Sequence, residues 1–193
     1  MHPSFRVALI AAAASSIVAI RPTVSAAQTQ QAMAAPNFPA VGQAAPDFSA
    51  TATDSTGKAI PVSLASMKGK VVVLAFYPLD RSSGCTIELS KFRDDYATLF
   101  GKDVVVLPAS IDSQQSHAGW AKDSHFPFAL ITDPSGELAN KYASQPAPGK
   151  YFRRTIFVIG KDGKVAYVDG RFNPNSQDAY DKMAAEIKKA STN

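Results

Sequence analysis

Cysteine is almost absent from this chain: Cys85 is the only one among 193 residues. A single cysteine cannot close an intramolecular disulfide, which excludes the disulfide frameworks of many exported proteins. It also excludes a Cys-x-x-Cys exchange pair. Cys85 is therefore either a small buried apolar residue, as free cysteine often is, or a nucleophile, a metal ligand or a thiol with an external partner.

The sequence also has no large excess of one charge sign, and it has few histidines. The net charge is +4, with acidic and basic residues interspersed and no basic stripe among aromatic residues, so charge does not predict nucleic-acid binding. The three histidines are His2, His117 and His125. Cys85 with the last two would lack a fourth protein ligand, so we predict no metal site and expect structural or hydrogen-bonding roles for both.

The first 26 residues have the three parts of a secretory signal peptide. The positively charged start "MHPSFR" precedes the apolar run "VALIAAAASSIVAI", and "VSA" offers a cleavage site before Ala27. The run is shorter than the roughly 20 residues of a membrane span. An uncleaved anchor is the alternative, because Arg21 follows the run. We expect a periplasmic or secreted protein with no stable membrane association after cleavage.

The remaining chain predicts a short leader and one domain. Residues 27–40, "AQTQQAMAAPNFPA", are polar, alanine-rich and interrupted by proline, which favours a flexible leader. Residues 41–193 contain no internal repeat or second linker, and they are numerous enough to bury a sizeable core. We therefore predict a single domain over 41–193.

Strand and helix patterns alternate through this domain. Apolar and β-branched runs predict strands at 70–77, 103–111, 128–132, 154–159 and 164–170. The last two flank the hairpin turn "GKDG". Helical spacing of apolar residues or polar helical composition predicts helices at 85–100, 113–123, 135–143 and 176–190. This order predicts an α/β fold, with a central mixed sheet and helices on both faces.

Cys85 follows strand 70–77, at the edge where α/β sheets form their sites. In the first turn of a helix a thiol meets unpaired N–H groups and the positive end of the helix dipole, which favour the thiolate. Pro78 constrains the chain as it leaves the strand, Gly84 allows backbone to approach the sulfur, and Ser82 offers a hydroxyl. Ser82 and Gly84 also suit an ordinary turn.

Three arginines are candidates for the cation that a reactive thiol needs. Arg81 lies in the loop and is expected to be a solvated charge, whereas Arg153 and Arg154 precede a buried strand. Alternate strand residues face opposite ways, so one of these two arginines is expected to point inward.

The stretch "FYPLDRSSGCTIE" resembles the peroxiredoxin active-site motif Pro-x-x-x-Thr/Ser-x-x-Cys, with Pro78, Ser82 and Cys85 at the required offsets. "GCTIELSKFRD" is most similar to the Q-type (bacterioferritin-comigratory) branch. "VGQAAPDF" and "MKGKVVVLAFYP" resemble the first strands of the family, and "SIDSQQSHAGWA" resembles its Ser-x-Asp-Ser-x-x-x-His-x-x-Trp segment. The resemblance implies a thioredoxin-like fold with peroxiredoxin additions.

The same resemblance implies a thiol peroxidase that reduces hydrogen peroxide, organic hydroperoxides or both, without a cofactor. The Cys85 thiolate would attack the peroxide and become a sulfenic acid. Arg154 would hold the thiolate, with Arg153 in that role if the register shifts by one residue. Ser82 and the backbone N–H groups of Gly84 and Cys85 would bind the peroxide.

Several other residues near the motif or elsewhere in the domain also have expected roles. Pro78 would shield the sulfur, and Glu88 would brace an arginine, as similar glutamates do in relatives, or act as a helix N-terminal charge. Trp120 is expected in the core or an interface more than in the site. Ser82 replaces the usual threonine, and Ser90 stands where relatives often carry a resolving cysteine.

Turnover with one cysteine requires an external thiol: a thioredoxin-like protein, a glutaredoxin-like protein or a low-molecular-weight thiol. Relatives include monomers and dimers, so a homodimer is one expected state. Two other functions compete with the peroxidase: an exported thioredoxin-like thiol–disulfide oxidoreductase and a catalytically silent binding domain. The first lacks its second cysteine. Retention of Pro78, Ser82, Cys85 and Arg154 together argues against the second.

Overall fold

The computed structural model of the protein describes residues 36–145 and 150–192. The predicted signal peptide and residues 27–35 of the predicted leader lie outside this part of the chain. Within it, no helix combines the length and the apolar character that crossing a bilayer would require.

Seven strands form one mixed sheet in the order β2-β1-β5-β4-β3-β6-β7. The strands are β1 Ser49–Thr53, β2 Ala59–Ser63, β3 Val71–Phe76, β4 Val104–Ser110, β5 Leu130–Thr132, β6 Thr155–Ile159 and β7 Val165–Asp169. β3, β4 and β5 run parallel to one another, while the other neighbours pair antiparallel. The predicted α/β architecture with a mixed sheet is confirmed.

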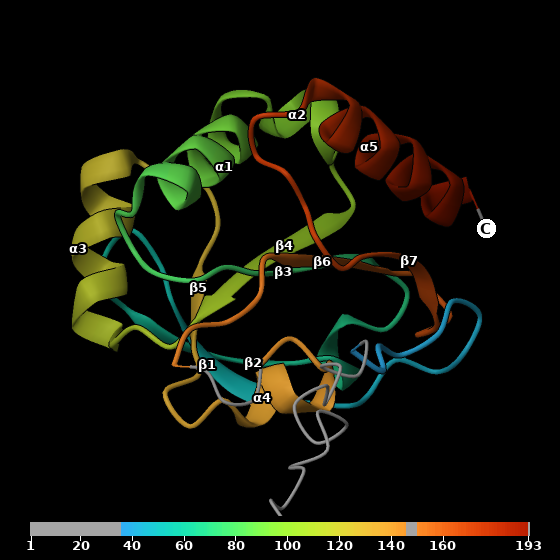
Figure 1. The fold of residues 1–193 in the computed structure, drawn as a ribbon, viewed down its shortest axis with the longest axis horizontal. Coiled ribbons are helices and arrows are strands. Elements are labelled where there is room, and N and C mark those ends of the chain that lie inside the picture. Colours follow the sequence, from blue (N-terminus) through green and yellow to red (C-terminus); the bar gives the residue numbers. More distant parts are fainter. Residues whose placement is uncertain (1–35, 146–149, 193) are drawn as a thin grey trace, which may run out of the picture. The chain divides into compact units, whose positions relative to one another are not determined.

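Helices cover both faces of the sheet. They are α1 Ser83–Asp94, α2 Tyr96–Leu99, α3 Gln114–Ser124, α4 Glu137–Lys141 and α5 Gln177–Thr192, with a 3₁₀ turn at Ala65–Met67. One core cluster joins the sheet to α1, α3 and α5, and a second joins its other face to α4. In Figure 1, α1, α2 and α5 accordingly lie above the central strands and α4 lies below them.

The central strand β3 shows why this sheet forms. All six of its residues are buried, and all are apolar. Side chains of a strand alternate between faces, so Val71, Val73 and Ala75 enter one cluster while Val72, Leu74 and Phe76 enter the other. A continuous apolar run therefore predicts a strand that is covered on both sides.

The helix predicted over 85–100 is wrong in its extent. The structure has two helices there, α1 and α2, separated by Asp95 with φ −103° and ψ 19°. The Asp95 carboxylate accepts a bond from Lys91, and its carbonyl oxygen accepts from the N–H groups of Thr98 and Leu99. Aspartate favours helix ends because its side chain competes with the helical backbone bonds, which accounts for the break.

The expectation that 41–48 forms a strand is also wrong. This segment makes only a single bridge, from Ala44 to Lys164, and Gly42 has φ +88°. The first strands are instead β1 and β2, a hairpin that the sequence analysis missed. Its signal was the turn at Asp54, whose carboxylate accepts bonds from the N–H groups of Thr56 and Lys58.

The end of the predicted leader packs onto the domain. The ring of Phe38 lies 6.0 Å from that of Phe157, edge to face, and Phe38 belongs to the margin of the second core cluster. Aromatic pairs in this geometry are stabilising. The packed part of the chain therefore includes residues before 41.

Candidate active site

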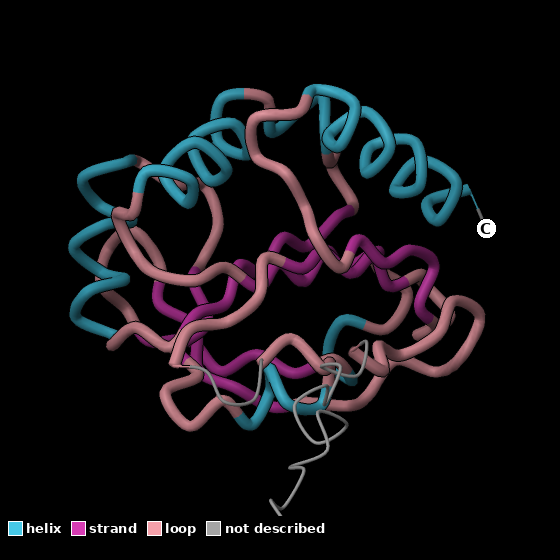
Figure 2. The backbone as a smooth tube through the Cα atoms, viewed as in Figure 1, coloured by secondary structure: helices cyan, strands magenta, loops and turns pink. Residues whose placement is uncertain are grey.

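The site is built where β3 leaves the sheet. The chain passes from Phe76 through an irregular loop and enters α1 at Ser83, as the change from strand to loop to helix in Figure 2 shows. Ser82 is the N-cap residue, in an extended conformation, and its carbonyl oxygen accepts the first helical bond from Thr86 N at 2.8 Å. Cys85 is thus in the first turn of α1, where helical N–H groups have no intrahelical acceptor.

Arg154 reaches Cys85 because of strand pairing. β6 runs antiparallel to β3 with Thr155 opposite Phe76, so the residue before β6 lies beside the carboxyl end of β3. The Nη2 atom of Arg154 donates to Cys85 Sγ at 3.3 Å, and Cys85 has no exposed surface. A cation at this distance can stabilise negative charge that develops on the sulfur.

Glu88 completes a buried chain of three groups. It lies three residues after Cys85, on the same face of α1, and forms an ion pair with Nη1 of Arg154. Its second oxygen, Oε1, is buried and has no hydrogen-bond partner among the described residues. Burial raises the pKa of Glu88 to about 7, although Arg154 acts in the opposite direction.

Arg154 stays protonated between Cys85 and Glu88. Burial alone would lower its pKa, but the negative charges of Glu88 and Cys85 outweigh that cost and leave the pKa raised. The guanidinium therefore holds the sulfur with one nitrogen and the carboxylate with the other, a use of two nitrogens in one plane that lysine cannot reproduce.

The absence of a side chain at Gly84 leaves room for the close approach of Arg154. A Cβ atom at residue 84 would lie 3.1 Å from Nη2 of Arg154 and 3.9 Å from Cγ of Pro174. The guanidinium would have to move away from the sulfur to accommodate it. The absence of a side chain at Gly84 thus keeps the donor near Cys85.

Ser82 and Pro78 lie on the loop that leads to the sulfur, and both are half-buried. The Ser82 hydroxyl does not cap the helix; it donates to the carbonyl oxygen of Leu79 at 3.1 Å. Its lone pairs remain available as acceptors, and rotation would redirect its proton.

The two remaining sequence candidates lie outside this group. Arg153 makes no hydrogen bond to Cys85 among the described residues, and its Nε atom is buried without a partner there. Trp120 is buried in the core, where its ring packs edge to face against Tyr77 at 5.9 Å and Phe126 at 5.2 Å. Arg154, not Arg153, is therefore the arginine that contacts the sulfur.

Sequence reasoning missed a second polar cluster beside the loop. The Asp80 carboxylate contacts Tyr77, which follows β3, and Ser116 and His117, which lie in the first turn of α3. The available signal was the similarity of "SIDSQQSHAGWA" to a family segment, which contains His117 without naming its partner.

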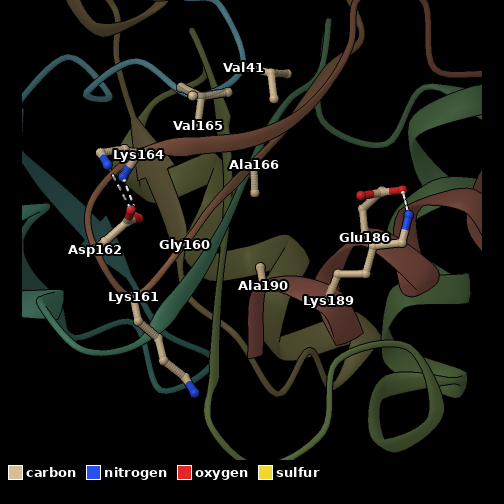
Figure 3. A pocket seen from close by; sticks show the side chains of 11 residues that line it. Val41, Gly160, Lys161, Asp162, Lys164, Val165, Ala166, Glu186, Lys189 and Ala190 are labelled. Carbon is tan, nitrogen blue, oxygen red and sulfur yellow. Dashed lines mark hydrogen bonds and ion pairs between the residues drawn. The ribbon is translucent and has the colours of Figure 1, made fainter. Parts of the chain in front are cut away.

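A surface hollow lies at the opposite edge of the sheet. It has a volume of about 360 Å³ and is lined by the turn between β6 and β7 and by the end of α5. Figure 3 shows two ion pairs among its lining residues, Lys164 with Asp162 and Lys189 with Glu186. Arg154 precedes β6 and Gly160 follows it, so this hollow is at the end of β6 remote from Cys85.

No group of three or more histidine, cysteine or acidic side chains suited to a metal ion occurs in the described part of the chain. The geometry around Cys85 is instead that of an activated thiol: helix N-terminus, cation and buried carboxylate.

The AhpC/TSA family matches residues 41–168, two thirds of the chain. The chain belongs to this family. Peroxiredoxin Bcp of Bacillus subtilis is 33% identical over 131 residues, which cover 65% of this chain and 81% of that protein. Peroxiredoxin Q of Sedum lineare chloroplasts is 35% identical over 138 residues, which cover 69% and 70% respectively.

Solved structures support the same assignment. Peroxidoxin BcpB from Mycobacterium tuberculosis superimposes with a TM-score of 0.66 at 29% identity, covering 78% of this chain and 97% of that one. The fold of this chain is thus thioredoxin-like, as expected. The chain resembles the Bcp and Q-type peroxiredoxins, and it carries a single cysteine, Cys85. It is a thiol peroxidase of the peroxiredoxin kind, and no comparison supports the thiol–disulfide oxidoreductase or the silent binding domain.

Proposed function

We propose that Cys85 reduces hydrogen peroxide or organic hydroperoxides through a sulfenic acid. The observation that supports this most directly is the 3.3 Å contact of Arg154 Nη2 with Cys85 Sγ in the first turn of α1. A nucleophilic thiol needs a nearby cation and helix N–H groups to stay ionised, and this one has both.

The reaction follows from these positions. The thiolate of Cys85 attacks one oxygen of the peroxide, an S–O bond forms and the O–O bond breaks. The departing oxygen takes a proton and leaves as water or an alcohol, and Cys85 becomes a sulfenic acid. Arg154 and the N–H groups of the first turn lie where they can stabilise the charge that develops on the oxygens.

Ser82 and Pro78 are assigned supporting roles. The hydroxyl of Ser82 precedes the first turn, and its proton can turn from Leu79 toward a bound oxygen. Pro78 is half-buried on the same loop and keeps water from the sulfur. Because Cys85 itself is fully buried, the residues around it must move for a peroxide to reach Sγ.

The sulfenic acid requires an external reductant, since the chain has no second cysteine. One thiol attacks the Cys85 sulfur and releases water, and a second thiol then displaces Cys85 from the mixed disulfide. A thioredoxin-like protein, a glutaredoxin-like protein or a low-molecular-weight thiol could supply both equivalents. Export through the signal peptide at 1–26 and a homodimeric state are further parts of the proposal, supported by the sequence pattern and by family resemblance respectively.

Stopped-flow mixing of the reduced protein with hydrogen peroxide tests the reaction, with Trp120 fluorescence as the signal. Trp120 packs on Tyr77, at the end of the strand that leads to the active-site loop, so its emission can report oxidation of Cys85. We expect a second-order phase much faster than that of a free thiol. A rate equal to that of glutathione under the same conditions would contradict the proposal.

A further inference from the structure

The carboxylate of Asp80 is buried in the loop between β3 and α1. Its side chain is 3% exposed, and it accepts hydrogen bonds from Tyr77 Oη at 2.7 Å and Ser116 Oγ at 2.6 Å. His117 Nδ1 lies 2.9 Å from Oδ2 of the same carboxylate. The steps proposed above use none of these four residues.

His117 connects this carboxylate to the sheet. The imidazole is fully buried, and its Nε2 atom lies 3.2 Å from the carbonyl oxygen of Ile131. A carbonyl oxygen can only accept, so Nε2 must carry a proton. Nδ1 lies within hydrogen-bond distance of the Asp80 carboxyl group, so the imidazole bridges that group and the sheet.

The main chain of Asp80 is held as well. Its N–H group donates to Oδ2 of Asp112 at 2.9 Å, and the same oxygen accepts from Ser110 Oγ at 2.8 Å. Ser110 ends β4, which lies beside β3 in parallel. The side chain of Asp80 is thus attached to α3, and its backbone is attached through Asp112 to the end of the neighbouring strand β4.

These attachments lie within the loop, one residue away from Ser82. Arg81 separates Asp80 from Ser82 and has φ +60°, a left-handed conformation that is uncommon for a non-glycine residue. Such a conformation persists where the surroundings determine the backbone on both sides. Ser82 is then the N-cap of α1, so the position of Asp80 sets the position of the first turn that contains Cys85.

We propose that Asp80 and His117 are positioning residues for peroxide reduction, an inference that rests on the proposed function of Cys85. The carboxylate, hydrogen-bonded to His117, holds the loop in the position in which Ser82 and the first turn of α1 face Arg154. Neither side chain touches the reacting atoms. Loss of the pair therefore misplaces the peroxide-binding groups while leaving the thiol itself in place.

Two substitutions of His117 separate its two contacts. In His117→Asn the amide nitrogen falls near the position of Nδ1 and can donate to Asp80, whereas in His117→Gln it falls near Nε2 and reaches Ile131 instead. Small misplacements of reacting groups have large effects on rate, so we expect His117→Gln to slow the reaction with hydrogen peroxide by about tenfold or more. His117→Asn should retain most of the rate.

Alkylation by iodoacetamide is the second measurement on each variant. It requires the Cys85 thiolate and access to it but none of the peroxide-binding geometry, so the positioning role leaves its rate unchanged. General loosening of the buried site would raise the alkylation rate. Asp123→Ala is the matched control, because it removes the exposed Arg81–Asp123 ion pair at 2.7 Å, another link between this loop and α3, and should alter neither rate.

The proposal is overturned if His117→Gln reacts with peroxide as fast as the unsubstituted protein, if His117→Asn loses as much rate as His117→Gln, or if the loss accompanies faster alkylation. Should His117→Gln not fold, Ser116→Ala removes one bond to Asp80 and is expected to slow peroxide reduction about threefold; an unchanged rate there overturns it equally. A slow reaction of the unsubstituted protein would contradict the proposed function first, and the inference with it.

Discussion

Two acid–base pairs, Asp80–His117 and Glu88–Arg154, lie at the loop between β3 and α1, and they differ in how fully their hydrogen-bonding groups are satisfied. Asp80 receives bonds from three side chains, and both nitrogens of its partner His117 have acceptors. In the Arg154–Glu88 pair, Oε1 of Glu88 is unbonded among the described residues, and Arg154 keeps one nitrogen on a sulfur.

We relate this difference in hydrogen bonding to the different roles of the two pairs. A fully bonded buried pair has one favourable arrangement, which suits it to fix a loop. A pair with unused bonding capacity beside a nucleophile can interact with an oxygen that arrives there. The catalytic side of the loop is therefore the incompletely bonded side, and the other side supplies rigidity.

The largest expected effect is the loss of the nucleophile. Cys85→Ser should abolish the rapid reaction with hydrogen peroxide, because no other thiol exists in the chain. Stopped-flow fluorescence and mass spectrometry of the oxidised protein measure this. Ser90→Ala, at the position where relatives often carry a resolving cysteine, is the control and should react normally; peroxide-dependent oxygen addition in Cys85→Ser would contradict the assignment.

Removal of the cation should have the next largest effect. Arg154→Gln leaves the sulfur without its charged donor, and we expect the second-order rate constant to fall about a hundredfold. Arg153→Gln is the matched comparison, since its side chain does not contact Cys85, and it should stay close to the unsubstituted rate. Equal losses in the two variants would show that the arginine register inferred from the 3.3 Å contact is wrong.

The raised pKa of Glu88 predicts that the stability of the fold depends on pH. Its folded-state pKa of about 7 is above its ordinary value of 4.5, because burial disfavours the charged form. Between these pH values the folded protein binds more protons than the unfolded chain, so the free energy of unfolding should fall as pH rises, by on the order of 1 kcal/mol per pH unit. Urea unfolding at pH 5, 6 and 7 measures the slope.

Glu88→Gln is the variant for this measurement. It removes the titrating group and should flatten the stability profile in the same pH range. Glu186→Gln, a substitution on the outer part of α5, is the control and should keep the slope of the unsubstituted protein. A slope that Glu88→Gln leaves intact would assign the pH dependence to another group.

The smallest predicted effect concerns the fully bonded side of the loop. Tyr77→Phe removes one donor to the Asp80 carboxylate and should reduce the free energy of unfolding by about 1–2 kcal/mol. Tyr142→Phe removes a bond of the same length, 2.7 Å, to the neutral carbonyl oxygen of Pro46. Bonds to charged groups are stronger, so urea unfolding should show the smaller loss for Tyr142→Phe.

Much of the fold and part of the site could be predicted locally. The apolar run at β3 and the amphipathic pattern of α5 depend on neighbouring residues alone, and so do the offsets of Pro78, Ser82 and Cys85. The hairpin of β1 and β2 was missed because its strands are short and partly exposed, with alternation too weak to detect. The break at Asp95 was missed because the apolar spacing continues across it.

By itself, the sequence determined that one thiol would stand in the first turn of a helix at the carboxyl end of a buried strand, because strand, turn and helix signals are local. Only the tertiary structure decided which arginine meets that thiol, since antiparallel pairing of β6 with β3 places Arg154 there. It alone brought His117 to Asp80, two residues on different elements. Contacts between distant segments depend on register and packing across the sheet, and neither is encoded in local spacing.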